Sequence, residues 1–432
     1  MCYAIPGKVE RISGNSATID YFGEKRSAFL GLAEGISEGD YVYAQGGFVV
    51  QKVGKKHALE NLGIWKELLA KLKKIDEQSL QKTKKTEDRR FDSILENALA
   101  GNAPDFSETT CLLETEDETK LEELFKTANS IRNKKLQNSC CVHGIIEFSN
   151  FCRNDCAYCG IRNGNEKLQR YRMSIDEIVS AADYAVNKLG FKALMLQSGE
   201  DSFYTEEKLV EIVEKIRKRC GAIIFLSVGE IGKGAYKKLY AAGARGVLMR
   251  FETSNAELYA RLHNGAKLDD RLRAIREVSE MGYVVATGSL VGLPNQTKED
   301  LANDILLAKK LNAEMFSFGP FIPTENTPLE GKEKVPVEDV LKVLAVARLV
   351  SQDAKILITT ALETIDENGA RKGLLAGANS LMINVTPEKY RKLYRIYDGK
   401  EKGEGVKRKI AKTIKLLNGL GRAPTDWNVA SA

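Results

Sequence analysis

Three cysteines, spaced as Cys152-x3-Cys156-x2-Cys159, are the residues of this 432-residue chain whose type and spacing point most directly to chemistry. Thiolates are soft ligands and the usual partners of iron–sulfur clusters, so three of them on one short segment can hold a cubic cluster and leave one iron open. The alternatives are a structural zinc site and three unrelated cysteines. A structural zinc ion takes four ligands, usually as paired short motifs, and no second pair is spaced to complete such a site.

Composition predicts an ordinary globular protein. The chain is 43% hydrophobic and 29% charged and has 9 prolines, which argues against disorder. No apolar run approaches the roughly 18 residues that span a bilayer, and the first residues become charged too soon for a signal peptide. We therefore expect a cytoplasmic protein with no membrane partner, in which 8 cysteines indicate metal or redox chemistry rather than disulfides.

The net charge of +6 is spread along the chain, with one basic concentration between Lys66 and Arg90. A nucleic-acid interface more often interleaves aromatic residues with basic ones, and this segment has none. We predict a solvated linker helix here and no nucleic-acid partner.

The elements that must position the cysteines form a regular pattern from Cys141 onward, where short apolar segments alternate with amphipathic ones such as Ser174–Leu189. Eight such βα units predict a complete (β/α)8 TIM barrel in the α/β class. The competing architecture is a doubly wound open sheet, which usually carries a glycine-rich dinucleotide loop that is absent here. The eight expected strands are His143–Phe148, Lys192–Gln197, Ala222–Ser227, Arg245–Arg250, Tyr283–Ser289, Glu314–Phe318, Lys355–Thr359 and Asn379–Asn384.

Polar residues follow nearly every expected strand. The cysteine segment comes after the first strand, and the active sites of such barrels lie at the carboxyl ends of the strands. We therefore expect these polar residues to converge on one site with the cysteines. The later ones are Gln197 to Glu200, Ser227, Arg250, Glu252, Gly288 to Pro294, Thr359, Thr360 and Asn384.

A different pattern precedes the barrel. Short alternating segments separated by glycine and charged turns predict a small β-barrel, followed by a helix over His57–Leu72. The expected strands are Ser16–Tyr21, Lys25–Leu30, Tyr41–Ala44 and Phe48–Val53. The predicted domains are the small barrel at 1–57, a helical lysine-rich linker at 58–90 and the large barrel at 91–432.

The segment SNFCRNDCAYCGIR resembles the radical S-adenosylmethionine (SAM) superfamily. That resemblance implies a [4Fe–4S] cluster on Cys152, Cys156 and Cys159, whose open iron binds the amino and carboxylate groups of SAM. LQSGED resembles the segment whose carboxylate receives the SAM ammonium, and GSLVGLP the glycine segment near its adenine. The implied cofactor-binding residues are Tyr158, Gln197, Ser198, Glu200, Ser227, Glu252, Arg271, Gly292, Met382 and Tyr394.

A narrower resemblance runs from about Phe91 to Lys400. GIIEFSNFCRNDCAYCGIR, RFETSNAELYARLH, VGLPNQTKEDLANDI and LMINVTPEKYRKLYRIYDGK are similar to HydE, the radical maturase of [FeFe]-hydrogenase, and to its relatives biotin synthase and methylornithine synthase. The resemblance implies that Arg250, Glu252, Thr359 and Thr360 face the substrate and act in catalysis. Phe225 and Phe251 stand where the family commonly has threonine and histidine, which predicts a different polar lining of the substrate cavity.

The N-terminus, MCYAIPGKVERI, resembles the HypC/HupF chaperones of [NiFe]-hydrogenase maturation. In that family the cysteine after the first methionine helps to hold an iron, so Cys2 is a candidate iron ligand. The family's partner histidine is replaced by Gln45. The alternative interpretation is a docking module that has lost its metal.

These resemblances together imply a radical SAM enzyme that acts on a small organometallic or thiol-containing precursor in hydrogenase maturation. The implied partners are a reductant such as ferredoxin or flavodoxin and other maturation proteins, with the N-terminal domain receiving or presenting the precursor. Two alternatives stay open. One is a methylornithine synthase-like enzyme with an amino-acid-like substrate, and the other is a non-enzymatic carrier of an iron cofactor.

Overall fold

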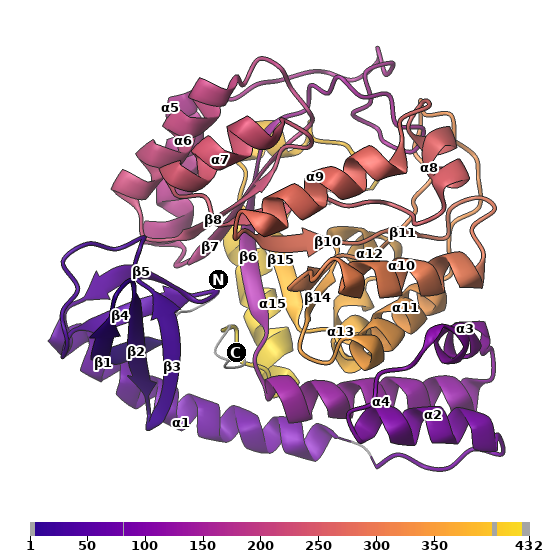
Figure 1. The fold of residues 1–432 in the computed structure, drawn as a ribbon, viewed down its shortest axis with the longest axis horizontal. Coiled ribbons are helices and arrows are strands. Elements are labelled where there is room, and N and C mark those ends of the chain that lie inside the picture. The colour runs from indigo at the N-terminus through magenta and orange to yellow at the C-terminus, as the bar shows by residue number, and fades with distance from the viewer. Residues whose placement is uncertain (1–4, 81, 400–403, 426–432) are drawn as a thin grey trace.

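Two closed barrels of different size, joined and flanked by helices, make up the molecule (Figure 1). The computed structural model describes residues 5–80, 82–399 and 404–425. Within these residues, no helix is both long and apolar enough to cross a membrane.

The strands of the small barrel alternate buried and exposed side chains, and the buried ones fill its interior when the sheet closes. Its strand order is β1-β2-β3-β5-β4, and Val9, Ile19, Val42 and Val49 are fully buried inside it. The first strand of this barrel was not among the strands expected from the sequence. A bulge between Val9 and Arg11 interrupts the alternation of buried and exposed residues on which such predictions depend. The strands are β1 (Pro6–Ser13), β2 (Ser16–Tyr21), β3 (Glu24–Phe29), β4 (Tyr41–Gln45) and β5 (Phe48–Val53).

Four helices connect the two barrels. The first begins earlier and ends later than the expected His57–Leu72, and it leads from the small barrel along the edge of the molecule toward the next helices (Figure 1). The helices are α1 (Lys55–Ser79), α2 (Arg89–Leu99), α3 (Phe106–Glu114) and α4 (Glu118–Leu136).

The large barrel confirms the predicted eight-stranded architecture in the described part of the chain. Each neighbouring pair of strands is parallel, and the closed order is β10-β12-β14-β15-β6-β7-β8-β9. The strands are β6 (Cys141–Ser149), β7 (Ala193–Ser198), β8 (Ile223–Ser227), β9 (Gly246–Leu248), β10 (Val284–Thr287), β12 (Met315–Phe316), β14 (Lys355–Ile358) and β15 (Ser380–Asn384). A separate two-stranded sheet pairs β11 (Leu290–Val291) with β13 (Gly319–Pro320).

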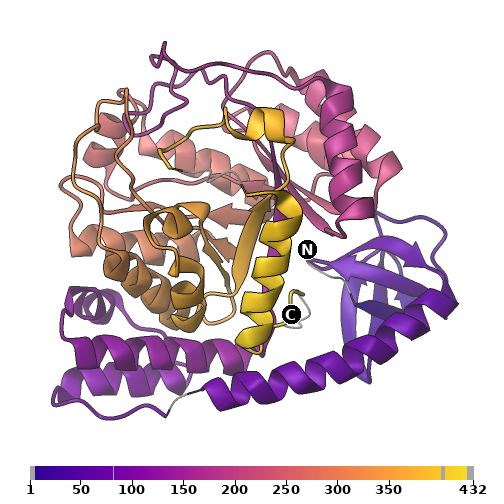
Figure 2. The ribbon, with the colours of Figure 1, turned by 180° about the vertical axis from the view of Figure 1, so that it is seen from behind.

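Helices surround this barrel (Figure 2). Several begin at side-chain caps, such as Ser174, which exchanges hydrogen bonds with Glu177 in a capping box. The helices are α5 (Ile175–Asp183) with a π-helical turn at Tyr184–Lys188, α6 (Glu206–Arg219), α7 (Lys233–Ala242), α8 (Ala256–Leu262), α9 (Leu268–Glu280), α10 (Lys298–Lys310), α11 (Val337–Val350), α12 (Thr360–Ile365), α13 (Gly369–Leu375), α14 (Glu388–Arg391) and α15 (Val406–Gly419).

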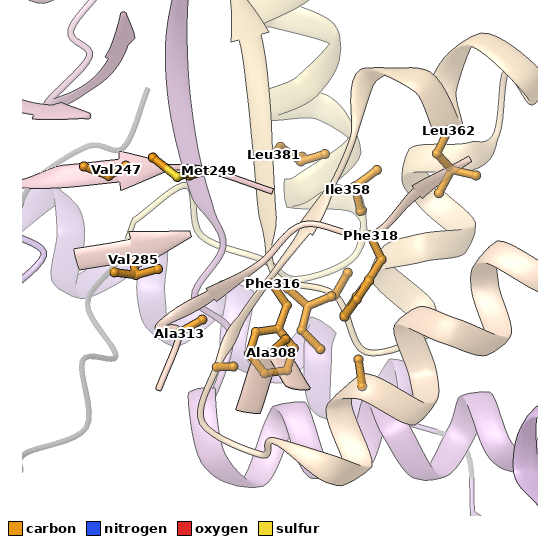
Figure 3. Close-up of a cluster of buried hydrophobic side chains, with 14 of the residues drawn as sticks. Val247, Met249, Val285, Ala308, Ala313, Phe316, Phe318, Ile358, Leu362 and Leu381 are labelled. Atoms are coloured by element: carbon orange, nitrogen blue, oxygen red, sulfur yellow. The ribbon is translucent and has the colours of Figure 1, made fainter. Parts of the chain in front are cut away.

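The core between strands and helices holds the strand ends in place. Figure 3 shows part of it, where Phe316 and Phe318 lie between the barrel strands and Ala308 of α10. The two rings meet edge to face with centroids 5.8 Å apart. Because this outer core is close-packed, the loops that leave the strands start from fixed positions.

Strand β6 is buried on both faces, as expected of a parallel strand covered by helices. Val142, Ile146 and Phe148 belong to the outer core, whereas Ile145 belongs to the cluster inside the barrel. Side chains alternate along a strand, so Cys141 and His143 share the inner face with Ile145.

The small barrel docks on the amino-terminal end of the large one. Lys192, just before β7, donates to Gln51 Oε1 at 2.8 Å, and Gln45 lies against Cys141 at the start of β6. Val50 packs into the same apolar cluster as Ile145. The docked end is opposite to the carboxyl ends of the strands.

A buried charge cluster joins α1 to α4 and to the chain after α15. Asp76 on α1 accepts from Arg132 at 2.6 and 2.8 Å and lies 3.3 Å from Arg422, and all three side chains are fully buried. Removing one partner of a buried pair leaves the other charge without compensation, which is strongly destabilising.

Asp76→Asn keeps the shape of the side chain and removes its charge. We expect it to lower the free energy of unfolding by about 3–5 kcal/mol, because Arg132 and Arg422 stay buried. Chemical denaturation followed by circular dichroism measures the change. Glu77→Gln is the matched control, since this exposed neighbour only pairs with Lys73 at 4.0 Å. Equal stability of the two variants would contradict this role for Asp76.

Candidate functional site

The cysteine segment after β6 lies at the mouth of the large barrel and is held there by its backbone. Arg153 N–H donates to the Glu200 carbonyl at 2.9 Å, Ala157 N–H to Leu262 at 2.8 Å, and Gly160 N–H to Ile396 at 3.0 Å. These three anchors come from loops far apart in the sequence. The segment is therefore positioned by the barrel rather than by its own local structure.

The thiols of this segment are half-buried and close enough to influence one another's ionisation. Burial raises the pKa of Cys152. Burial, followed by the nearby Cys159 and Cys152, raises the pKa of Cys156. Thiols that resist ionisation by themselves become thiolates when metal binds, because a bound cation removes the proton. The donor set fits a cluster held by three thiolates.

The structure was also searched for side chains that could hold a single metal ion. Among residues 5–80, 82–399 and 404–425, no group of three or more histidine, cysteine, aspartate or glutamate side chains is placed to hold one metal ion.

Beside the cysteines the barrel mouth opens into a cavity of about 300 Å³. Its walls bring together nearly all the residues that the sequence singles out. They are Cys152, Tyr158, Cys159, Gln197, Ser198, Glu200, Ser227, Arg250, Glu252, Arg271, Thr359, Thr360, Met382 and Tyr394.

One wall carries paired charges of both signs. Glu200 accepts from the Glu230 backbone at 3.0 Å and pairs with Arg153 at 3.0 Å. Arg271, in the first turn of α9, lies 2.8 Å from Glu230 and 3.9 Å from Glu200. A carboxylate and a guanidinium side by side are suited to the ammonium and carboxylate of an amino-acid group.

A glycine makes room for that carboxylate. Gly229 has φ +75°, and a β-carbon there would lie 2.1 Å from the Glu200 carboxyl. Any other residue would therefore displace Glu200 as well as strain the backbone.

A second charged pair, Arg250 with Glu252, lies in the connection between β9 and α8. Arg250 Nη2 is 2.8 Å from Glu252 Oε2, although the angle is too poor for a hydrogen bond. Glu252 has φ +66°, a strained conformation of the kind that clusters at functional sites. In the described structure, buried Arg250 Nε and Thr359 Oγ1 also have no hydrogen-bond partner. These atoms are available to a bound molecule.

Tyr158 rests on a histidine that the sequence did not single out for function. His263 Nδ1 lies 2.9 Å from the Tyr259 carbonyl, which can only accept, so Nδ1 carries the proton and Nε2 accepts from the Tyr158 hydroxyl at 3.1 Å. Burial lowers the pKa of His263 to about 4, which keeps the ring neutral at pH 7. The pair fixes the ring of Tyr158 beside the cysteines. Tyr158 and His263 are 105 residues apart in the sequence, so no local pattern could reveal their contact.

Some predicted site residues lie elsewhere. Cys156 and Gly292 are absent from the cavity wall; Gly292 has φ +85°, and a β-carbon there would lie 2.3 Å from Val335. Phe225 belongs to the inner cluster below the cavity and Phe251 to the outer core, so these two family departures do not change the cavity wall as predicted. Cys2 falls outside the described residues.

Other residues of the wall were missed. Tyr397 shares a hydrogen bond of 2.6 Å with Thr360, and Phe321 follows β13 in the small two-stranded sheet. Both lie outside the expected strands and their immediate ends, where no periodic signal marks them.

Three family models match consecutive parts of the chain. They are the HupF/HypC family at residues 1–65, the radical SAM superfamily at 146–308, and the biotin and thiamin synthesis associated domain at 317–421.

Individual relatives match the barrel over most of their length. The [FeFe] hydrogenase maturase subunit HydE of Thermotoga maritima is 41% identical over 71% of this chain and 88% of the relative. The 3-methylornithine synthase of Methanosarcina acetivorans is 31% identical over 78% of this chain and 95% of the relative. Among solved structures, methylornithine synthase (PylB) matches with a TM-score of 0.70 at 28% identity, over 77% of this chain and 97% of that one.

Cys156→Ala tests the cluster site. We expect the variant to lose the bound iron and sulfide that the parent acquires on anaerobic reconstitution, because two thiolates cannot hold the cluster as three do. Metal and sulfide analysis and visible absorbance measure the loss. Cys111→Ala, which removes a half-buried thiol from α3, is the matched control. Full iron and sulfide content in the Cys156 variant would count against this ligand set.

Glu200→Gln tests the charged wall. We expect SAM to bind the cluster-loaded variant about 10 to 100-fold more weakly, since a hydrogen bond to a charged group is worth roughly 1.5–3 kcal/mol. Calorimetry under anaerobic conditions measures the affinity. The control is Glu206→Gln, a nearby carboxylate that pairs with Lys238 at the surface. Unchanged affinity in the Glu200 variant would remove that carboxylate from the SAM site.

Proposed function

The chain belongs to the radical SAM superfamily, in the group of HydE, methylornithine synthase and biotin synthase, and from this premise we propose that it is a maturase acting on a hydrogenase cofactor precursor. The enzyme uses a [4Fe–4S] cluster and SAM. When bound, the cluster supplies an electron that breaks a carbon–sulfur bond of SAM and yields a 5′-deoxyadenosyl radical.

In this chemistry the protein holds the cluster and orients SAM beside it. Cys152, Cys156 and Cys159 bind the cluster, while Glu200 receives the SAM ammonium and Arg271 its carboxylate. Gln197, Ser198, Ser227, Met382 and Tyr394 complete the SAM pocket, and Gly292 supports the segment near the adenine. Tyr158, fixed by His263, closes the side of the cluster.

The cavity also excludes water from the radical. Ile145, Leu248, Leu357 and Met382 form its apolar inner part, beneath the polar rim. A dry site prevents a reactive carbon radical from being quenched before it meets the substrate.

One observation carries the assignment to hydrogenase maturation. A barrel similar to HydE and a HupF/HypC-family domain occur in one chain, with the small domain docked on the base of the barrel. The relative is named as an [FeFe] hydrogenase maturase subunit. We infer that the substrate is a small organometallic or thiol-containing precursor, that a ferredoxin or flavodoxin supplies the electron, and that other maturation proteins exchange the precursor.

An amino-acid-like substrate is the second candidate. The Arg250 guanidinium and the Glu252 carboxylate together could grip a zwitterion, and Thr359 and Thr360 lie on the same cavity wall. The 31% identical methylornithine synthase supports this alternative.

Product analysis decides between the candidates. The anaerobically reconstituted chain, given dithionite and SAM, should form 5′-deoxyadenosine. Small thiols and iron–thiolate complexes should stimulate its formation more than free α-amino acids do. A true substrate that is deuterated at the reacting position should pass its deuterium to 5′-deoxyadenosine. The reverse order of stimulation would favour the amino-acid candidate. If neither 5′-deoxyadenosine nor an adenosyl adduct forms, the catalytic proposal fails.

Paired variants separate an enzyme from a carrier. If the chain only carries iron, Cys2→Ala abolishes function in a maturation assay and Cys156→Ala does not. The radical reaction predicts that Cys156→Ala abolishes both maturation and 5′-deoxyadenosine formation.

A further inference from the structure

An exposed aromatic ring at the mouth of the large barrel is contacted by two cations. Phe203, in the loop between β7 and α6, is 45% exposed. The Lys208 ammonium lies 3.4 Å from the centroid of its ring, and the Arg172 guanidinium lies 4.7 Å from the same centroid. These contacts hold a large apolar side chain in one orientation at the edge of the barrel.

The same guanidinium connects this ring to the cysteine segment. Arg172 lies 3.7 Å from the ring centroid of Phe151, the residue directly before Cys152. Its Nε and Nη2 donate to the two carboxylate oxygens of Asp201 at 2.7 and 2.8 Å, which fixes the guanidinium plane. Phe203, Arg172 and Phe151 therefore form a continuous arrangement, the aromatic stack, that leads from the surface to a cluster ligand.

The aromatic stack lies outside the SAM cavity. Cys152 and Cys159 line that cavity, whereas the three residues of the stack are absent from its wall. In the proposed function SAM occupies the cavity side of the cluster, so the side that bears the stack remains accessible to another molecule. An electron that enters here does not have to cross the SAM pocket.

The surface around the stack presents cations to solvent and buries their acidic partners. The side chain of Arg153 is 60% exposed, and that of its partner Glu200 only 10%. Arg172 is 34% exposed, and Asp201 only 2%. The Lys208 ammonium donates to a neutral backbone carbonyl at 3.0 Å. The face is therefore positive toward solvent, which is complementary to a partner with an acidic surface.

A hollow of about 210 Å³ adjoins the stack, with Arg153, Asp201 and Tyr204 in its wall. Glu206 borders the same hollow, but its carboxylate pairs with Lys238. Aromatic and arginine side chains are the ones that contribute most of the binding energy at protein interfaces. A protruding ring beside a hollow, surrounded by cations, has the character of a protein-docking surface.

We propose that the aromatic stack and the cations around it are the docking surface for the electron donor, a small acidic protein that carries a one-electron redox centre. This proposal rests on the proposed function and names the place where that partner binds. The donor is oxidised by one electron, and the [4Fe–4S]²⁺ cluster takes up that electron to become [4Fe–4S]⁺. No proton and no chemical group is transferred in this step.

Direct binding of a donor tests the surface without turnover. A purified flavodoxin and a purified ferredoxin are each titrated into the full-length chain at low salt, and calorimetry measures the affinity. We expect at least one of them to bind, more weakly as salt is added. Phe203→Ala should weaken this binding about 10-fold, because the ring that contacts the partner is lost. Lys208→Glu should also weaken it about 10-fold, because it reverses a charge on the docking face.

Lys215→Glu is the matched control. Lys215 lies about two turns further along α6, away from the barrel mouth, and its side chain is exposed. The substitution makes the same change of charge on the same helix and should leave the affinity unchanged. Its ion pair with Glu211 at the surface contributes little to stability.

A chemical reductant separates this proposal from the proposed function. With the reduced protein donor, Phe203→Ala and Lys208→Glu should lower the rate of 5′-deoxyadenosine formation about 10-fold at donor concentrations below saturation. With dithionite, which needs no docking surface, both variants should match the parent. If the parent forms no 5′-deoxyadenosine with dithionite, the proposed function fails, and the binding measurements still decide whether the surface docks the donor.

Thermal melting shows whether each variant is folded. Folded Phe203→Ala and Lys208→Glu variants that bind the donor as tightly as the parent overturn the proposal, and so does a parent that binds neither flavodoxin nor ferredoxin. An equal loss of activity with dithionite also overturns it, because the two side chains would then support the cysteine segment rather than a partner.

Discussion

Closure of the parallel barrel is the constraint on which the rest of the structure depends. Each strand pairs with neighbours on both sides, so the eight strands point the same way and end at one rim. The outer core around Phe316 and Phe318 locks this arrangement. Loops separated by more than 200 residues, such as those with Cys152 and Tyr394, thereby meet at one cavity.

Some residues at the rim of the barrel need an unusual backbone conformation or extra space. Glu200 reaches its position because Gly229 leaves space, and Glu252 adopts a left-handed conformation between β9 and α8. The surrounding structure must offset such strain. The opposite end of the barrel is covered by the small barrel, whose Gln45 lies against Cys141 at the start of β6.

The sequence predicted the features that local patterns encode. The eight strands, the cysteine segment and the polar residues after the strands follow from periodicity and spacing, and the barrel and the two cofactors are confirmed. The domain limits and the individual ligand roles stay predictions. Sequence patterns failed where contacts between distant residues determine the structure. They missed strand β1, which a bulge interrupts, and the last residues of α1 up to Ser79, where Asp76 is buried against Arg132. They also missed the contact between Tyr158 and His263. The contact between Gln45 and Cys141 joins residues 96 positions apart, so no local pattern reveals it.

Helix α1 is a tether as well as a connector. It ties the small barrel to the large one through a continuous 25-residue element whose end is clamped by Arg132. A tethered module meets its binding face at an effective concentration in the millimolar range, whatever the amount of protein in the cell. Under the proposed function, transfer of a precursor between the two barrels is therefore an intramolecular event, governed by a first-order rate. A freely diffusing chaperone would instead have to find its enzyme anew for every cargo.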